Sequence, residues 1–181
     1  MPLTDARRQE LRAKYREERD KRLRPDGNEQ YIEPKGKFAH YVEDPYVERV
    51  ERDPIVQDIE VAVVGAGFGG LSAGAHFALQ GITDVWLIDG AGDVGGVWYW
   101  NRYPGARVDI QSVEYSMSFD PQLEKDWKWS EKFSPQPELL RYARHISERY
   151  DLRRDIRFDT RVESASWDDA RRRWTVRTTA G

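Results

Sequence analysis

The sequence predicts an α/β fold built on a parallel sheet. Two short runs of β-branched and apolar residues, 59–64 and 84–88, are typical of buried parallel strands. A stretch rich in small, helix-forming residues lies between them and ends at Gly81. A strand, a helix and a second strand within residues 59–89 require a right-handed crossover, so the two strands are expected to run parallel.

Charge is distributed unevenly along the 181 residues. Residues 1–54 carry 13 basic and 13 acidic side chains, whereas residues 59–118 carry only eight charged side chains. A densely charged segment buries little apolar surface, so the core is expected in the second stretch. We therefore predict an N-terminal arm over residues 1–58 and a domain over residues 59–181.

The arm is predicted to begin as a helix and to continue as extended chain. Residues 4–24 are good helix formers, Thr4 suits the N-cap, and residues 24–28 contain proline and glycine that end the helix. Residues 29–58 place aromatic side chains between prolines. They fit a partner-binding arm or, as we favour, an extended segment that lies over the domain surface and is anchored there by Tyr and Phe.

Further elements are predicted after residue 130. Residues 134–150 predict a helix whose inner face carries apolar side chains three or four residues apart: Leu139, Ala143, Ile146 and Tyr150. Residues 155–158 predict a short strand, and residues 160–179 alternate as in a β-hairpin with a turn at 168–170.

A glycine-rich turn joins the first strand to the helix, with the spacing Gly-x-Gly-x-x-Gly. Gly65 permits the tight turn, Gly67 lets backbone approach a pyrophosphate, and Gly70 lets the helix pack closely on the sheet. Phe68 and Gly69 lie between them, at a helix N-terminus that offers free N–H groups. We predict a Rossmann-like dinucleotide site; the alternative is a glycine turn that binds nothing.

Asp89 ends the second strand, 19 residues after Gly70, close to the spacing of about 20 found in dinucleotide-binding units. A carboxylate there accepts hydrogen bonds from a ribose hydroxyl and repels a 2′-phosphate. The first nucleotide is therefore expected to be FAD or NAD rather than NADP.

Composition excludes several other classes of protein. The chain has no cysteine, so it forms no disulfide, and its three histidines lack metal-ligand spacing. A net charge of −3 argues against nucleic-acid binding, and no apolar run is long enough to span a bilayer. The first ten residues lack the apolar segment of a secretory signal, and we expect a cytoplasmic protein.

A second glycine cluster, within residues 92–109, distinguishes FAD from NAD. It matches a fingerprint of Gly-Gly-x-Trp, four residues, an aromatic residue, Pro-Gly, three residues and Asp, at Gly95, Gly96, Trp98, Tyr103, Pro104, Gly105 and Asp109. Here the sequence resembles the class B flavoprotein monooxygenases, specifically the N-terminal part of the Baeyer–Villiger monooxygenases. The resemblance covers about residues 59–179.

The resemblance implies a set of cofactor contacts. The backbone of the second cluster would lie beside the ribityl–pyrophosphate part of FAD at Gly95, Gly96 and Val97. Three aromatic side chains would pack against the flavin: Trp98, Tyr99 and Trp100. The remaining implied contacts are Tyr115 near the flavin, Val162 near the adenine, and Arg107, Val108 and Asp109 near the nicotinamide nucleotide. Core packing or a partner surface is the alternative role of the three consecutive aromatic residues.

Asp109 is the one catalytic candidate. By the resemblance it lies near the flavin and orients an active-site arginine, because a carboxylate holds a guanidinium in a fixed fork. A helix N-cap at the turn formed by residues 110–112 is a second role that Asp109 could fill.

The resemblance implies an NADPH- and O2-dependent enzyme that converts small-molecule ketones to esters or lactones through a C4a-peroxyflavin. The family's second Gly-x-Gly-x-x-Gly for NADPH, its Phe-x-Gly-x-x-x-His-x-x-x-Trp-Pro motif and its catalytic arginine do not occur in these 181 residues. We therefore expect an inactive N-terminal fragment with an incomplete FAD domain. An N- or S-oxidising monooxygenase and a non-catalytic FAD-binding module are the alternatives, and the oligomeric state is undetermined.

Overall fold

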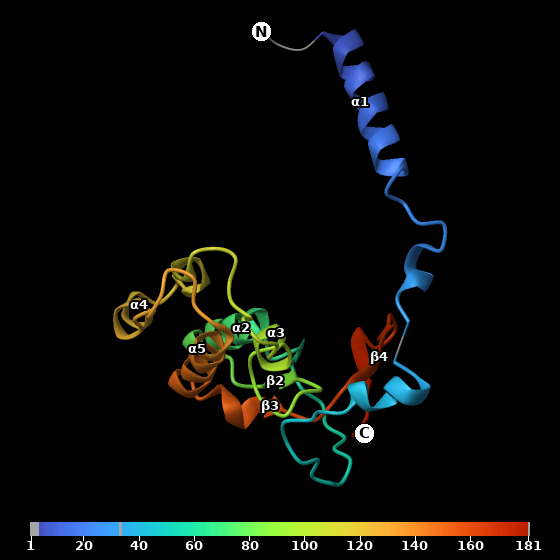
Figure 1. The fold of residues 1–181 in the computed structure, drawn as a ribbon. Helices are drawn as coiled ribbons and strands as arrows, with labels where there is room; N and C mark the ends of the chain where they lie inside the picture. Colours follow the sequence, from blue (N-terminus) through green and yellow to red (C-terminus); the bar gives the residue numbers. More distant parts are fainter. Residues whose placement is uncertain (1–3, 33, 181) are drawn as a thin grey trace. The chain divides into compact units, whose positions relative to one another are not determined.

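The computed structural model describes residues 4–32 and 34–180, which form two compact units (Figure 1). The first unit ends at Glu43 and the second begins at Asp44. Residues 44–58, which composition assigned to the arm, group with the second unit. The proposed start of a cofactor-binding domain at residue 59 stays a prediction.

The first unit contains the predicted charged helix, α1 (Asp5–Asp20). The Thr4 hydroxyl accepts a hydrogen bond from the Arg7 backbone amide at 3.3 Å, which confirms the predicted N-cap. No residue of α1 is buried. Two 3₁₀ turns follow, η1 (Gly27–Gln30) and η2 (Gly36–Val42).

Three parallel strands form the sheet of the second unit, in the order β1 (Val61–Val64), β2 (Val85–Ile88) and β3 (Ile156–Arg157). The predicted parallel pair is confirmed, and β1 and β2 are in register from Val61 opposite Val85. The third strand pairs with β2, placing Ile156 opposite Leu87, a neighbour relation that the sequence alone did not indicate.

Two helices build the core beside this sheet (Figure 1). Helix α2 (Phe68–Leu79) contacts β1 and β2, and α5 (Gln136–Arg149) contacts α2. The predicted inner face of α5 is confirmed by three buried side chains: Leu139, Ala143 and Ile146. Ala143 and Ile146 join one apolar cluster with residues such as Leu71, Leu87 and Ile156, whose burial stabilises the fold.

Short elements complete the second unit: α3 (Val97–Trp100), η3 (Ser112–Tyr115), α4 (Pro121–Asp126) and η4 (Leu152–Asp155). The predicted hairpin is confirmed as β4 (Val162–Asp168) and β5 (Arg173–Thr178), which pair antiparallel. In the part of the chain that the structure describes, no helix is long and apolar enough to cross a membrane. Those same residues contain no group of three or more His, Cys, Asp or Glu side chains that could hold a metal ion.

Candidate functional site

The first glycine turn connects β1 to α2. Gly65 adopts φ +100° and donates its amide to the Ile88 carbonyl at 2.8 Å. A Cβ on Gly70 would lie 1.9 Å from the Gly65 carbonyl oxygen, so only glycine permits this close crossing of helix and strand. Gly67 caps α2 without any side-chain hydrogen bond, which leaves the first-turn amides available to an anion.

The second glycine turn lies directly against the first. Gly95 and Gly96 adopt φ values of +123° and +55°, and the Gly95 amide donates to the Ala66 carbonyl at 3.0 Å. A Cβ on Gly96 would be 3.0 Å from the Gly67 Cα, and one on Gly67 would be 3.4 Å from the Gly96 Cα. The two clusters, separate in the sequence, therefore form one backbone surface.

Asp89 lies at the carboxyl end of β2, beside the first turn. One carboxylate oxygen accepts the Ala66 amide at 2.5 Å and the other accepts the Ala91 amide at 2.8 Å. A carboxylate accepts about four hydrogen bonds, so both oxygens keep capacity for a ribose hydroxyl. The predicted acid is thus fixed next to the predicted phosphate turn.

Three aromatic side chains meet at the N-terminal end of α2. Tyr115 contacts Phe68 edge-on, with ring centroids 5.5 Å apart, and Trp98 edge-on at 5.7 Å. Edge-to-face pairs of this kind are a favourable aromatic arrangement. These three residues come from separate segments of the sequence and were each predicted as a cofactor contact, and the structure brings them together.

Tyr99 and Trp100 differ sharply in exposure. Tyr99 is 1% exposed and packs with Ala91 and Leu140, whereas Trp100 is 38% exposed. Burial raises the pKa of the Tyr99 phenol, and its hydrogen bond to Asp44 raises that pKa further. Core packing, the alternative role, is therefore what the Tyr99 side chain does here, and its contact with a cofactor stays a prediction.

Arg107 and Val108 are held by the segment before α5. The Arg107 guanidinium donates to the Glu131 carboxylate at 3.1 Å and to the Phe133 carbonyl at 2.9 Å. Val108 is buried, and its amide donates to the Ser134 carbonyl at 3.1 Å. Val108 can therefore offer a ligand only backbone and a small part of its surface.

Asp109 is exposed, and within residues 34–180 no hydrogen bond or ion pair engages its side chain. The 3₁₀ turn η3 has Gln111 at its N-cap, so the alternative of Asp109 as a helix cap is wrong. Val162 begins β4 opposite Thr178. Gly69 and Val97 are exposed near the two glycine turns, as ligand contacts require.

Sequence reasoning missed Asp93, which anchors the second turn. Its carboxylate accepts Arg144 Nε at 2.8 Å, Arg153 Nη1 at 2.7 Å and the Val94 amide at 2.8 Å. Burial alone would raise the pKa of Asp93, but the hydrogen bonds from Arg153, Val94 and Arg144 together lower it. No local pattern marks such a residue, because its partners lie 51 and 60 positions away.

Gln136 and Asp44 also escaped prediction. Gln136 donates its side-chain amide to the Trp98 carbonyl and so ties α3 to the start of α5. Asp44 accepts the Tyr99 hydroxyl at 2.6 Å. The sequence predicted a helix that includes Gln136 but not this contact, and nothing around Asp44 signalled its role.

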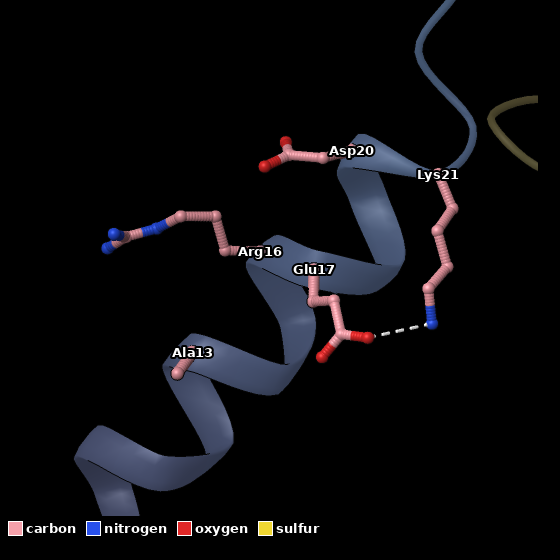
Figure 2. A pocket seen from close by; sticks show the side chains of 5 residues that line it. All are labelled: Ala13, Arg16, Glu17, Asp20 and Lys21. Carbon is pink, nitrogen blue, oxygen red and sulfur yellow. Dashed lines mark ion pairs between the residues drawn. The ribbon is translucent and has the colours of Figure 1, made fainter.

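Two surface hollows are lined by residues outside the glycine turns. Figure 2 shows the first, which is open and lined by residues of one region only, the end of α1: Ala13, Arg16, Glu17, Asp20 and Lys21. Lys21 and Glu17 form an ion pair at 3.0 Å there. The second, of about 80 Å³, lies between α2 and η4. Neither has the groups that a dinucleotide needs.

Comparison with known proteins agrees with this geometry. A family model described as an NAD(P)-binding Rossmann-like domain matches residues 63–128, which include all three glycines of the first turn and the whole second turn. Pentalenolactone D synthase of Streptomyces exfoliatus is 47% identical over 173 residues, 94% of this chain. A Baeyer–Villiger monooxygenase of Streptomyces coelicolor is 43% identical over 169 residues, 93% of this chain.

Solved structures give the same relationship. An oxidised steroid monooxygenase bound to NADP matches 69% of this chain with 58% identity and a TM-score of 0.67. The enzyme OTEMO in complex with FAD and NADP matches 71% with 36% identity and a TM-score of 0.63. This chain is homologous to the N-terminal part of Baeyer–Villiger monooxygenases.

The chain spans only part of each of these relatives: 28% of the two Streptomyces proteins and about a quarter of the two solved chains. Because the Streptomyces matches cover more than nine tenths of this chain, they include most of residues 1–58. Acetone monooxygenase of Gordonia sp., 43% identical over 123 residues, matches only 68% of this chain. The arm thus has counterparts in some Baeyer–Villiger relatives, although the sequence offered no motif there.

Proposed function

We propose that this chain supplies the FAD-binding part of an NADPH- and O2-dependent Baeyer–Villiger monooxygenase acting on small-molecule ketones. The observation that carries the proposal is the direct contact between the two glycine turns at the uncapped N-terminus of α2. The names of the relatives support the ketone substrate and O2, and the OTEMO complex supports FAD and NADP. A cytoplasmic location is part of the same proposal.

The residues present suit FAD. Backbone without Cβ atoms at Gly67 and Gly96 leaves room for a pyrophosphate, and the first amides of α2 supply positive partial charge. The Asp89 carboxylate suits a ribose hydroxyl, which matches the unphosphorylated ribose of FAD's adenosine.

The chain's own groups would bind, orient and shield. FAD, when bound, supplies the redox and oxygen chemistry that amino-acid side chains lack. The α2 amides would hold the phosphates, Asp89 the ribose, and the cluster of Phe68, Trp98 and Tyr115 would keep water from the bound ring system.

Asp109 is proposed as the carboxylate that orients a catalytic guanidinium. Its exposure and its lack of partners within residues 34–180 leave both oxygens free for a bidentate pair. In an active enzyme, replacing Asp109 with Ala is expected to preserve FAD content and to slow oxygenation. Unchanged turnover would contradict this role.

The test of FAD binding compares alanine variants at the two ends of α2, its N-cap Gly67 and its C-cap Gln80. A methyl on Gly67 would meet the Gly96 Cα at an ordinary 3.4 Å, so Gly67→Ala is expected to fold but to obstruct the pyrophosphate. Gln80→Ala changes an exposed residue at the opposite end of this helix from the glycine turns and is the matched control. Titration by flavin fluorescence is expected to show weak binding by the 181-residue chain, retained by Gln80→Ala and lost by Gly67→Ala.

Equal binding by Gly67→Ala and Gln80→Ala would contradict the assignment of the turn. Absence of any binding by the unaltered chain at millimolar FAD would contradict an FAD site formed by these residues alone.

A further inference from the structure

We propose that residues 44–52, called the strap below, are a working part of this site, and that Asp44 is the positioning residue for the second glycine turn. The inference rests on the proposed function, since it gives these residues a task in holding the cofactor turn. It concerns a segment that composition had assigned to the arm.

A single carboxylate oxygen of Asp44 closes the second turn. Asp44 Oδ2 accepts the Gly92 amide at 2.8 Å and the Tyr99 hydroxyl at 2.6 Å. Gly95 and Gly96 lie between these two partners in the sequence. Asp44 thus joins both ends of the segment whose middle contacts the first glycine turn.

Neighbouring strap residues pack on the same segment. The Tyr46 ring meets the Tyr99 ring edge-on at 5.5 Å, and the Tyr46 hydroxyl donates to the Trp100 carbonyl at 3.2 Å. The Val47 side chain occupies the space beside Gly92, where a Cβ would come within 2.1 Å of it. Gly92 therefore accommodates the strap rather than the cofactor.

The C-terminal end of the strap, at Arg52, contacts the segment just before β4, where the predicted adenine contact Val162 lies. Arg52 donates to the Phe158 carbonyl at 2.7 Å and also to the Thr160 hydroxyl. The Thr160 amide in turn donates to the Asp89 carbonyl at 2.9 Å. The strap therefore touches both segments that flank the predicted adenosine site.

The second turn needs this support because of its composition. Glycines at positive φ have the largest backbone freedom, and ordering them costs the most conformational entropy. A charge-assisted hydrogen bond to a buried phenol and a backbone amide opposes that freedom. Without Asp44 we expect the turn to leave the Gly67 backbone more often, which would weaken any ligand held between the two turns.

The experiment measures amide hydrogen exchange by NMR in the 181-residue chain and its Asp44→Asn and Tyr99→Phe variants. The decisive probe is the Gly95 amide, which bonds to Ala66 and does not contact Asp44. We expect its exchange to quicken at least tenfold in both variants. The Leu71 amide in α2 is expected to keep its rate, which separates a local effect from unfolding.

Asp58→Asn is the matched control, because Asp58 lies near the strap and pairs with Arg173 at 3.1 Å in exposed surroundings. It is expected to leave the Gly95 rate unchanged. If Asp44→Asn and Tyr99→Phe change that rate no more than Asp58→Asn does, the positioning role is wrong.

FAD titration of the same variants separates this inference from the proposed function. Weaker binding by Asp44→Asn than by Asp58→Asn supports both. If the unaltered chain binds no FAD, an FAD site formed by these residues alone is contradicted, and the exchange rates alone decide whether Asp44 positions the turn.

Discussion

At the scale of single residues, the glycines of the two turns have different tasks. Gly65, Gly95 and Gly96 adopt positive φ values that other residues rarely accept. Gly70 is required for a different reason, because its Cβ would collide with the Gly65 carbonyl. Gly69 has neither constraint, so an alanine at this position is a control for the effect of Gly70→Ala on stability.

Gly70→Ala is expected to destabilise the fold by roughly 1–3 kcal/mol, because either the helix or the strand must move to admit the methyl group. Gly69→Ala adds a methyl in open space within a helix, and is expected to stabilise by up to about 1 kcal/mol. Urea denaturation followed by circular dichroism measures both. Equal stabilities of the two variants would contradict the close crossing at Gly70.

At the scale of elements, α5 and η4 hold the second turn from outside the sheet. Arg144 of α5 and Arg153 of η4 both bond to Asp93, which precedes the Gly-Gly pair by two positions. Tyr142 of α5 is buried and accepts the Met117 amide at 2.9 Å through its hydroxyl. The helix thus bonds to two separate loops.

The lowered pKa of Asp93 makes its ion pairs with Arg144 and Arg153 sensitive to acid. A carboxyl whose pKa is lower in the folded state stabilises the protein above its unfolded pKa, and that contribution is lost as pH falls through the folded pKa. Asp93→Asn is therefore expected to cost roughly 1–2 kcal/mol at neutral pH.

The cost of Asp93→Asn is expected to shrink as the pH falls below about 4, the ordinary aspartate pKa. Thermal denaturation of both proteins between pH 3 and 7 tests this. A stability difference that stays constant over that range would contradict a stabilising role for the ion pairs of Asp93.

At the scale of the whole molecule, the chain consists of two units, and the strap belongs to the second. Helix α1 of the first unit buries no residue, so its stability depends on local capping and exposed ion pairs. The second unit contains the core, both glycine turns and every predicted site residue.

Shortening the chain from its N-terminus is expected to have two distinct effects. A protein beginning at Asp44 is expected to keep its Tm within about 2 °C of the full chain, since the core and the strap remain. A protein beginning at Ile59 loses the strap, at about 2–3 kcal/mol, and its Tm is expected to fall by about 10 °C. Equal Tm values of these two proteins would show that the strap stabilises nothing.

The sequence by itself determined the local structure of this protein. Strand, helix and turn preferences act over a few residues, so the Gly-x-Gly-x-x-Gly turn, Asp89 and the inner face of α5 were all visible in it. The family resemblance added the second glycine turn and the aromatic residues that follow it.

Only the tertiary structure decided which of these pieces touch. The contact between Gly67 and Gly96 joins positions 29 residues apart, and the hydrogen bond from the Tyr99 hydroxyl to Asp44 joins positions 55 residues apart. Such contacts depend on the simultaneous packing of several elements around the core, and no local preference encodes them. That is why the sequence placed Asp44 in an arm, and the structure places it against the second glycine turn.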